Sequence, residues 1–142
     1  MGEELAAANV NRSYSLSATN IAIFAFILFF LYPRFENGAI NPILFQCTLI
    51  VMGVATFSLV FATFLYYRAS LGGRMTEAAR ALHSRRADRL WLLGYTLMML
   101  APCLVLFLVG LVAVAAVWFT LWLVYMLFVI RSFPRVQTPR PE

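Results

Sequence analysis

The fold is decided by residues 90–130, LWLLGYTLMMLAPCLVLFLVGLVAVAAVWFTLWLVYMLFVI, a stretch of 41 residues with no formal charge and no histidine. A single helix of this length would measure ~62 Å, about twice the ~30 Å hydrocarbon core of a bilayer. Gly110 divides the stretch into 90–109 and 111–130, and each part is long enough to cross once. We therefore predict two membrane spans joined by a very short turn at Gly110.

Pro102 offers a competing division of the same stretch. Proline lacks the N–H that a helix interior needs, so a break there would leave one span from Pro102 to Ile130 and three spans in all. The C-terminal arginines would then lie across the membrane from the basic segment 68–89, against the tendency of basic residues to stay in the cytoplasm. We favour the turn at Gly110 and keep the break at Pro102 as the alternative.

Two more apolar blocks precede this stretch. Residues 15–32 form the first predicted span, which Pro33 ends, and the polar residues before it are predicted to be a mobile lead-in. Residues 41–67 form the second span, with Asn41 as the N-cap and Pro42 at the first helical position. The chain is 63% hydrophobic and 12% charged, against about 45–50% and about 25% in soluble domains. These values exclude a soluble domain and predict one membrane domain over residues 1–142.

Positive charge gathers in two segments outside the spans. All eleven basic residues are arginine, and the formal net charge is +5. Segment 68–89 holds six arginines against Glu77 and Asp88, which gives +4, and the tail 131–142 holds three against Glu142, which gives +2. The positive-inside tendency places both segments, and both termini, in the cytoplasm. We therefore predict a multi-pass protein of the cell (inner) membrane with both ends inside.

The basic segment 68–89 shows helical periodicity from about residue 75 to residue 90. This pattern predicts an amphipathic helix that lies at the head groups or rises as a stem into the third span. The tail 131–142 is rich in proline and is predicted to be disordered. Arginines beside membrane spans meet anionic lipid, so we expect no nucleic acid partner. The arginines predicted to contact anionic head groups are Arg74, Arg80, Arg85, Arg86 and Arg89.

The predicted spans contain no Asp, Glu, Lys, Arg or His. Charged groups inside a bilayer mark ion pathways, proton relays and voltage sensors, so their absence argues against those functions. His83 is the only histidine, and no Gly-rich phosphate loop, Ser/His/Asp set or HExxH motif occurs. We expect no enzymatic activity, no cofactor and no metal.

Sulfur side chains form the sharpest alternative to that expectation. Cys47 and Cys103 each lie about six residues from the outer ends of their spans, which puts both at a depth of ~9 Å. Thiolate and thioether ligands suit Cu(I), so a copper site or a redox pair is one interpretation. Methionine and cysteine are also ordinary apolar packing residues, and we favour that interpretation. The candidate cluster is Cys47, Cys103, Met52 and Met99.

Small residues line one side of each of two predicted spans. Small side chains let helix backbones approach closely, so such a side should face a neighbouring helix, and an aromatic side should meet lipid or a partner protein. On the last span the small side is Ala113, Ala116 and Thr120, and the opposite, aromatic side is Trp118, Trp122 and Tyr125. On the second span the small stripe, for packing or pore lining, is Thr48, Ala55, Ser58 and Ala62.

The sequence therefore predicts an all-α integral membrane bundle of four transmembrane helices, with a cytoplasmic amphipathic helix between helices two and three. The predicted function is non-enzymatic: helix–helix association in the bilayer, as an accessory or assembly subunit or as a homo-oligomer. Its expected partners are lipid, other membrane subunits or copies of itself. The alternative is an uncoupled oligomeric pore or facilitator for ions or small solutes, with Thr48, Ser58 and Ala62 towards the lumen.

Overall fold

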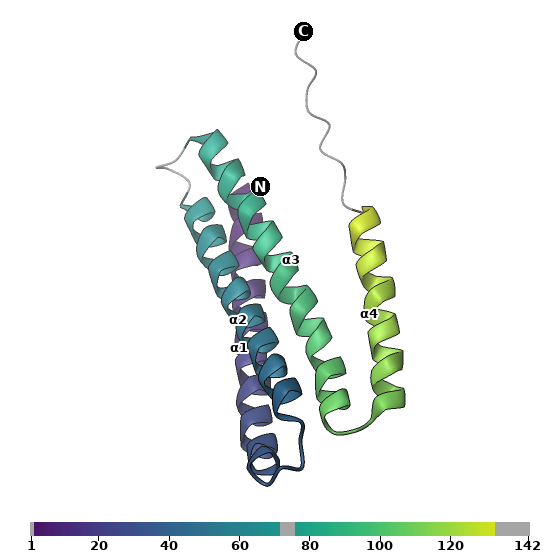
Figure 1. Ribbon diagram of the computed structural model, residues 1–142. Helices are drawn as coiled ribbons and strands as arrows, with labels where there is room; N and C mark the ends of the chain where they lie inside the picture. Colours follow the sequence, from purple (N-terminus) through teal and green to yellow (C-terminus); the bar gives the residue numbers. More distant parts are fainter. Residues whose placement is uncertain (1, 72–75, 133–142) are drawn as a thin grey trace.

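The computed structural model describes residues 2–71 and 76–132, and this part of the chain forms four helices. They are α1 (Gly2–Glu36), α2 (Pro42–Ser70), α3 (Glu77–Leu108) and α4 (Val112–Ser132). Each is long and apolar enough to cross a membrane. The predicted all-helical, multi-pass architecture is therefore confirmed. The helices run alternately up and down, so the start of α1, the end of α2, the start of α3 and the end of α4 share one end of the molecule (Figure 1).

Helix α1 is longer than the sequence predicted at both ends. It begins at Gly2, so the expected mobile lead-in is helical, and it passes through Pro33 to end at Glu36. A proline in the last turn removes only one hydrogen bond. The helix ends instead where Gly38 adopts a left-handed backbone with φ 68°, which glycine tolerates because it has no Cβ. Proline near a helix end is therefore a poor marker of the final residue.

Helix α2 begins as the sequence predicted. The Oδ1 atom of Asn41 accepts hydrogen bonds from the backbone N–H groups of Ile43 at 3.0 Å and Leu44 at 3.2 Å. Pro42 occupies the first turn, where its missing N–H costs nothing. The N-cap thus satisfies two donors that the helix itself leaves unpaired.

The amphipathic segment between spans two and three is not a separate helix. Residues 77–89 are the first turns of α3, which continues without interruption through Pro102 to Leu108. The segment rises as a stem because Ala87 packs in a buried cluster with Ala62 and Tyr66 of α2. That contact aligns it with the bundle axis. Of the two predicted placements, the stem into the third span is therefore the one found, and the separate helix between spans two and three is not.

The α3–α4 connection is closed entirely by backbone hydrogen bonds. Gly110 has φ 84°, its N–H donates to Phe107 O at 3.1 Å, and the N–H of Leu111 donates to Leu106 O at 2.9 Å. These two bonds form a Schellman motif, which ends a helix without any polar side chain. The chain therefore reverses at Gly110. A turn made only of apolar residues can connect two antiparallel helices, because its hydrogen bonds come from the backbone. Arg131 and Ser132, the first two residues of the tail predicted to be disordered, belong to α4, and the rest of that tail lies outside the described residues.

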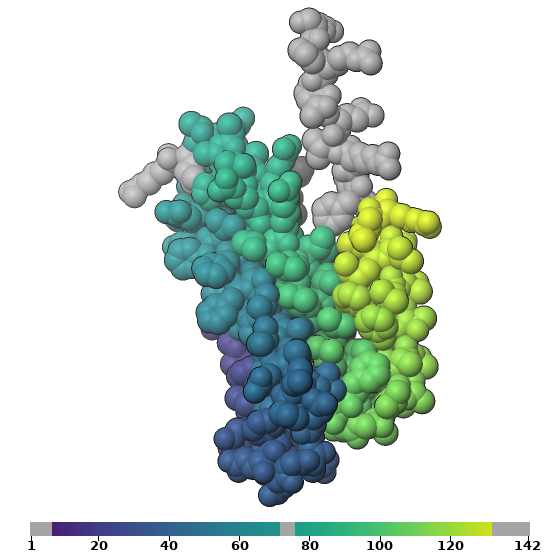
Figure 2. Space-filling model, viewed as in Figure 1, coloured from purple at the N-terminus to yellow at the C-terminus, as the bar shows by residue number. Residues whose placement is uncertain are grey.

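Helices α1, α2 and α3 pack closely, whereas α4 stands beside them. The main helix contacts are α2 with α3, then α1 with α2, and then α3 with α4. Figure 2 shows α4 attached along one side of the molecule, and the α3 and α4 ribbons diverge away from their connection (Figure 1). Ala115 is the one fully buried apolar residue of α4 among those described. The buried core is consequently a property of the first three helices.

Candidate functional site

The small stripe of α2 includes a close approach of its backbone to α3. Ala55 and Leu59 are fully buried, and they face Gly94 of α3. A Cβ placed on Gly94 would lie 2.8 Å from Leu59 Cγ and 2.9 Å from Ala55 O, closer than real Cβ atoms approach. Sequence reasoning missed Gly94, although an isolated glycine in an apolar span signals a close backbone approach. The four predicted stripe residues are all buried: Thr48, Ala55, Ser58 and Ala62.

A buried amide links α1 to α2. The Nδ2 group of Asn20 donates to Met52 O at 3.0 Å and to Thr56 Oγ1 at 2.7 Å. Thr56 Oγ1 in turn donates to Met52 O at 2.9 Å. A carbonyl only accepts, so the amide orientation is fixed with its NH2 group towards α2. Asn20 Oδ1 is buried and has no hydrogen-bond donor within the described part of the chain.

Asn20 was not singled out from the sequence, because an amide carries no formal charge and Asn20 belongs to neither of the two small-residue stripes. The signal that was available is its spacing. Ser13, Ser17 and Asn20 recur at intervals of four and three residues, and all three are buried on one side of α1. Such a polar stripe in an apolar helix is typical of an interhelical contact.

Polar contacts at one end of the bundle join its first three helices. Tyr66 of α2 donates its hydroxyl to Asp88 Oδ1 of α3 at 2.6 Å. The Arg12 guanidinium of α1 lies 4.5 Å from the ring centroid of Trp91 of α3. We call this the basic end, because Arg85, Arg86 and Arg89 are also exposed there. Among residues 2–71 and 76–132, the charged residues of the opposite end are Arg34 and Glu36. Among the arginines predicted to contact lipid, Arg80 is half-buried and Arg74 lies outside the described residues.

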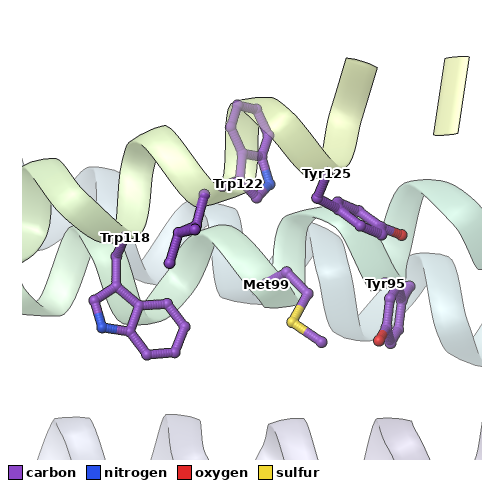
Figure 3. Close-up of a pocket in the computed structure, with 6 residues that line it drawn as sticks. Tyr95, Met99, Trp118, Trp122 and Tyr125 are labelled. Carbon is purple, nitrogen blue, oxygen red and sulfur yellow. The ribbon is translucent and has the colours of Figure 1, made fainter. Parts of the chain in front are cut away.

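In α4 the aromatic side contacts α3 and the small side is exposed, which is the reverse of the prediction. Trp122 Nε1 donates to Thr96 O of α3 at 3.0 Å, and the ring of Tyr125 meets that of Tyr95 edge-on at 6.2 Å. Figure 3 shows Trp118 and Tyr125 extending from α4 towards Met99 and Tyr95. Large rings reach across the space between diverging helices, and a buried indole N–H requires an acceptor. The side that should have met a neighbouring helix is exposed instead: Ala113, Ala116 and Thr120.

The four candidate sulfur residues differ in burial and in the neighbours they contact. Cys47 is exposed on α2, whereas Cys103 is buried and its thiol donates to Ala115 O of α4 at 3.3 Å. Met52 is fully buried against α1, and Met99 is 40% exposed beside Trp118. Cys47 therefore lies at the surface of α2 and Cys103 lies in the contact of α3 with α4, and the sulfur site stays an untested alternative. Within residues 2–71 and 76–132 no group of three or more His, Cys, Asp or Glu is placed to hold a metal.

A groove runs between α1, α3 and α4. It has a volume of about 650 Å³, and its lining includes Leu16, Ile23, Phe26, Met98, Val105 and Trp118. A second cavity of about 600 Å³ continues it towards the basic end and is lined in part by Asn11, Arg12 and Ser15. Leu16 and Tyr95 line both cavities, so they are adjacent parts of one groove. Its volumes fall within the range of ligand-binding clefts, ~300–1,000 Å³.

Comparison of the chain with protein-family models, with curated proteins and with solved structures found no match. The geometry itself offers two features: an exposed side of small residues on α4, and a groove that is apolar at depth and polar at its mouth.

Proposed function

We propose that this chain is a non-enzymatic integral membrane protein that works by helix–helix association, with the outer side of α4 as its contact surface. The observation that supports the proposal is the exposure of Ala113, Ala116 and Thr120. Trp122 and Tyr125 of α4 contact α3, so the small side is available to a helix from outside the chain. A shallow hollow of about 290 Å³ lies there, lined by Ala116, Thr120 and two neighbours. Small residues around a hollow permit close backbone approach.

The partner is a second copy of this chain or another membrane subunit. The basic end is cytoplasmic in this proposal, at the inner membrane, because arginine-rich margins stay inside. Membrane-impermeant thiol labelling of Ala81→Cys and Ala39→Cys, in a background with Cys47→Ser, reports that orientation from opposite ends of the bundle. Labelling of Ala81→Cys from the outside of intact cells would contradict it.

Association is tested by energy transfer between donor-labelled and acceptor-labelled chains in lipid vesicles. Ala116→Leu should raise the dissociation constant about tenfold, since overpacking a close contact costs about 1–3 kcal/mol. Ala25→Leu is the matched control, because Ala25 is exposed on α1, away from the proposed surface. If wild-type chains show no energy transfer and no partner copurifies from native membranes, the proposal is wrong. Equal effects of the two substitutions would place the contact elsewhere.

A further inference from the structure

The groove between α1, α3 and α4 has the polarity expected of a site for a single lipid. Its deeper part is lined almost entirely by apolar side chains, among them Ile23, Phe26 and Val105. Its mouth, at the basic end, is lined by the polar residues Asn11, Arg12 and Ser15. An amphipathic ligand fits this order, with hydrocarbon inside and a charged group at the mouth.

The length of the groove matches one leaflet. Its lining on α1 runs from Leu16 to Ile27, eleven residues apart, which is ~17 Å along a helix. Half of a ~30 Å hydrocarbon core is ~15 Å. A lipid acyl chain that starts at the basic margin would therefore fill the groove to about the bilayer midplane.

Arg12 gives the mouth its chemical preference. Its guanidinium lies 4.5 Å from the centroid of the Trp91 ring. The attraction between the positive charge and the face of the ring holds the guanidinium in place. The in-plane N–H groups of a guanidinium match the spacing of two phosphate oxygens. The nearby carboxylate of Asp88 accepts the hydroxyl of Tyr66 and so is directed towards α2. The exposed Arg85 and Arg89 add positive charge at the same end.

From these observations we infer that the groove binds one anionic phospholipid, with its phosphodiester at Arg12 and an acyl chain between α1 and α3. The site is independent of the association surface on α4, and Ala116→Leu should leave it intact. It also differs from a general attraction of lipid to the arginine-rich end, because it depends on one arginine and one groove.

Native mass spectrometry of the full chain, released from nanodiscs of equal phosphatidylglycerol and phosphatidylcholine, tests the head-group contact. The wild-type chain should retain one phosphatidylglycerol in preference to phosphatidylcholine. Arg12→Gln should lower that preference about tenfold, because the variant loses the charge-assisted hydrogen bonds of the guanidinium to the phosphodiester. Arg68→Gln is the matched control, an exposed arginine of the same end that does not line the groove. Equal losses in both variants would overturn the inference.

A second pair of variants tests the acyl chain contact. Ile23 and Ile21 are both exposed isoleucines of α1, but only Ile23 lines the groove. Ile23→Trp should fill the groove and abolish retention of phosphatidylglycerol, whereas Ile21→Trp should retain it. Both positions face outward, so both variants should fold, which far-ultraviolet circular dichroism checks. Retention by Ile23→Trp, equal retention of phosphatidylcholine, or a second protein chain in place of lipid would each overturn the inference.

Discussion

The α2–α3 and α3–α4 interfaces are built from different side chains, although α3 takes part in both. Against α2 the closest contact is backbone to backbone, because Gly94 lies over Ala55 and leaves no room for a Cβ. Against α4 the contact is made by large rings, with Trp122 bonded to Thr96 O and Tyr125 beside Tyr95. The first kind of interface leaves no space between the helices, whereas beside the second a groove lies between α1, α3 and α4. The difference separates a closely packed core from a fourth helix that is attached mainly along α3.

The largest expected effect is at Gly94. Gly94→Ala introduces a Cβ that would meet Ala55 O and Leu59 Cγ below 3.0 Å, so the helices must separate. Overpacking of this kind costs about 1–3 kcal/mol. We expect the free energy of unfolding, measured by titration with sodium dodecyl sulfate in mixed micelles, to fall by that amount.

Gly53→Ala is the matched control, because a Cβ at Gly53 meets no atom within 4 Å. The same change of residue should there be neutral or stabilising by up to about 1 kcal/mol, the difference in helix propensity. If the two alanine variants behaved alike, the close crossing of α2 and α3 would not be a determinant of stability.

A smaller effect is expected at the amide that joins α1 to α2. Asn20→Leu removes the donors to Met52 O and Thr56 Oγ1, and interhelical hydrogen bonds in membranes contribute about 0.6 kcal/mol and at most ~1.7 kcal/mol each. We expect a loss of about 1–2 kcal/mol in the same unfolding assay. Thr19→Val is the control, because Thr19 is exposed and bonds only its own helix, to Ser15 O.

A double-mutant cycle separates the two bonds of Asn20. Thr56→Val removes one acceptor and leaves Met52 O in place, so Asn20→Leu should cost less in the Thr56→Val background than in the wild type. Additive losses would show that the contact between the two side chains contributes nothing to stability.

Much of the fold was predictable from local patterns, because each relevant signal is short-range. The length of the charge-free stretches predicted the number of helices long enough to span a membrane, and Asn41 and Pro42 predicted the start of α2. Gly110 predicted the turn between α3 and α4, which is a Schellman motif made of backbone hydrogen bonds alone. The extent of α3 was not predictable from hydropathy. Hydropathy marks where a chain enters lipid, whereas a helix continues into water when its residues favour it.

The partners of each face were harder to predict, because periodicity identifies which residues share a side but not what that side meets. The small stripe of α2 was visible in the sequence and is buried in the structure, yet its partner Gly94 lies 39 positions after Ala55 in the sequence. The bond from Asn20 to Met52 spans 32 residues. On α4 the rule that small residues face a neighbouring helix failed within the chain, because the aromatic residues Trp122 and Tyr125 occupy the contact with α3.

The smallest effect is expected at the attachment of α4, where it should change motion more than stability. Trp122→Phe removes the indole bond to Thr96 O but keeps an aromatic ring, and a single hydrogen bond contributes about 0.5–1.5 kcal/mol. Spin labels at Leu82 on α3 and Phe128 on α4, both exposed, measure the spread of distances between the helices. We expect that distribution to broaden in Trp122→Phe and to stay unchanged in Trp118→Phe, because Trp118 is 45% exposed and its indole has no hydrogen bond to residues 2–71 or 76–132. A distribution that broadened equally in both variants would assign the attachment of α4 to ring packing, and an unchanged distribution in both would assign it to the short turn at Gly110.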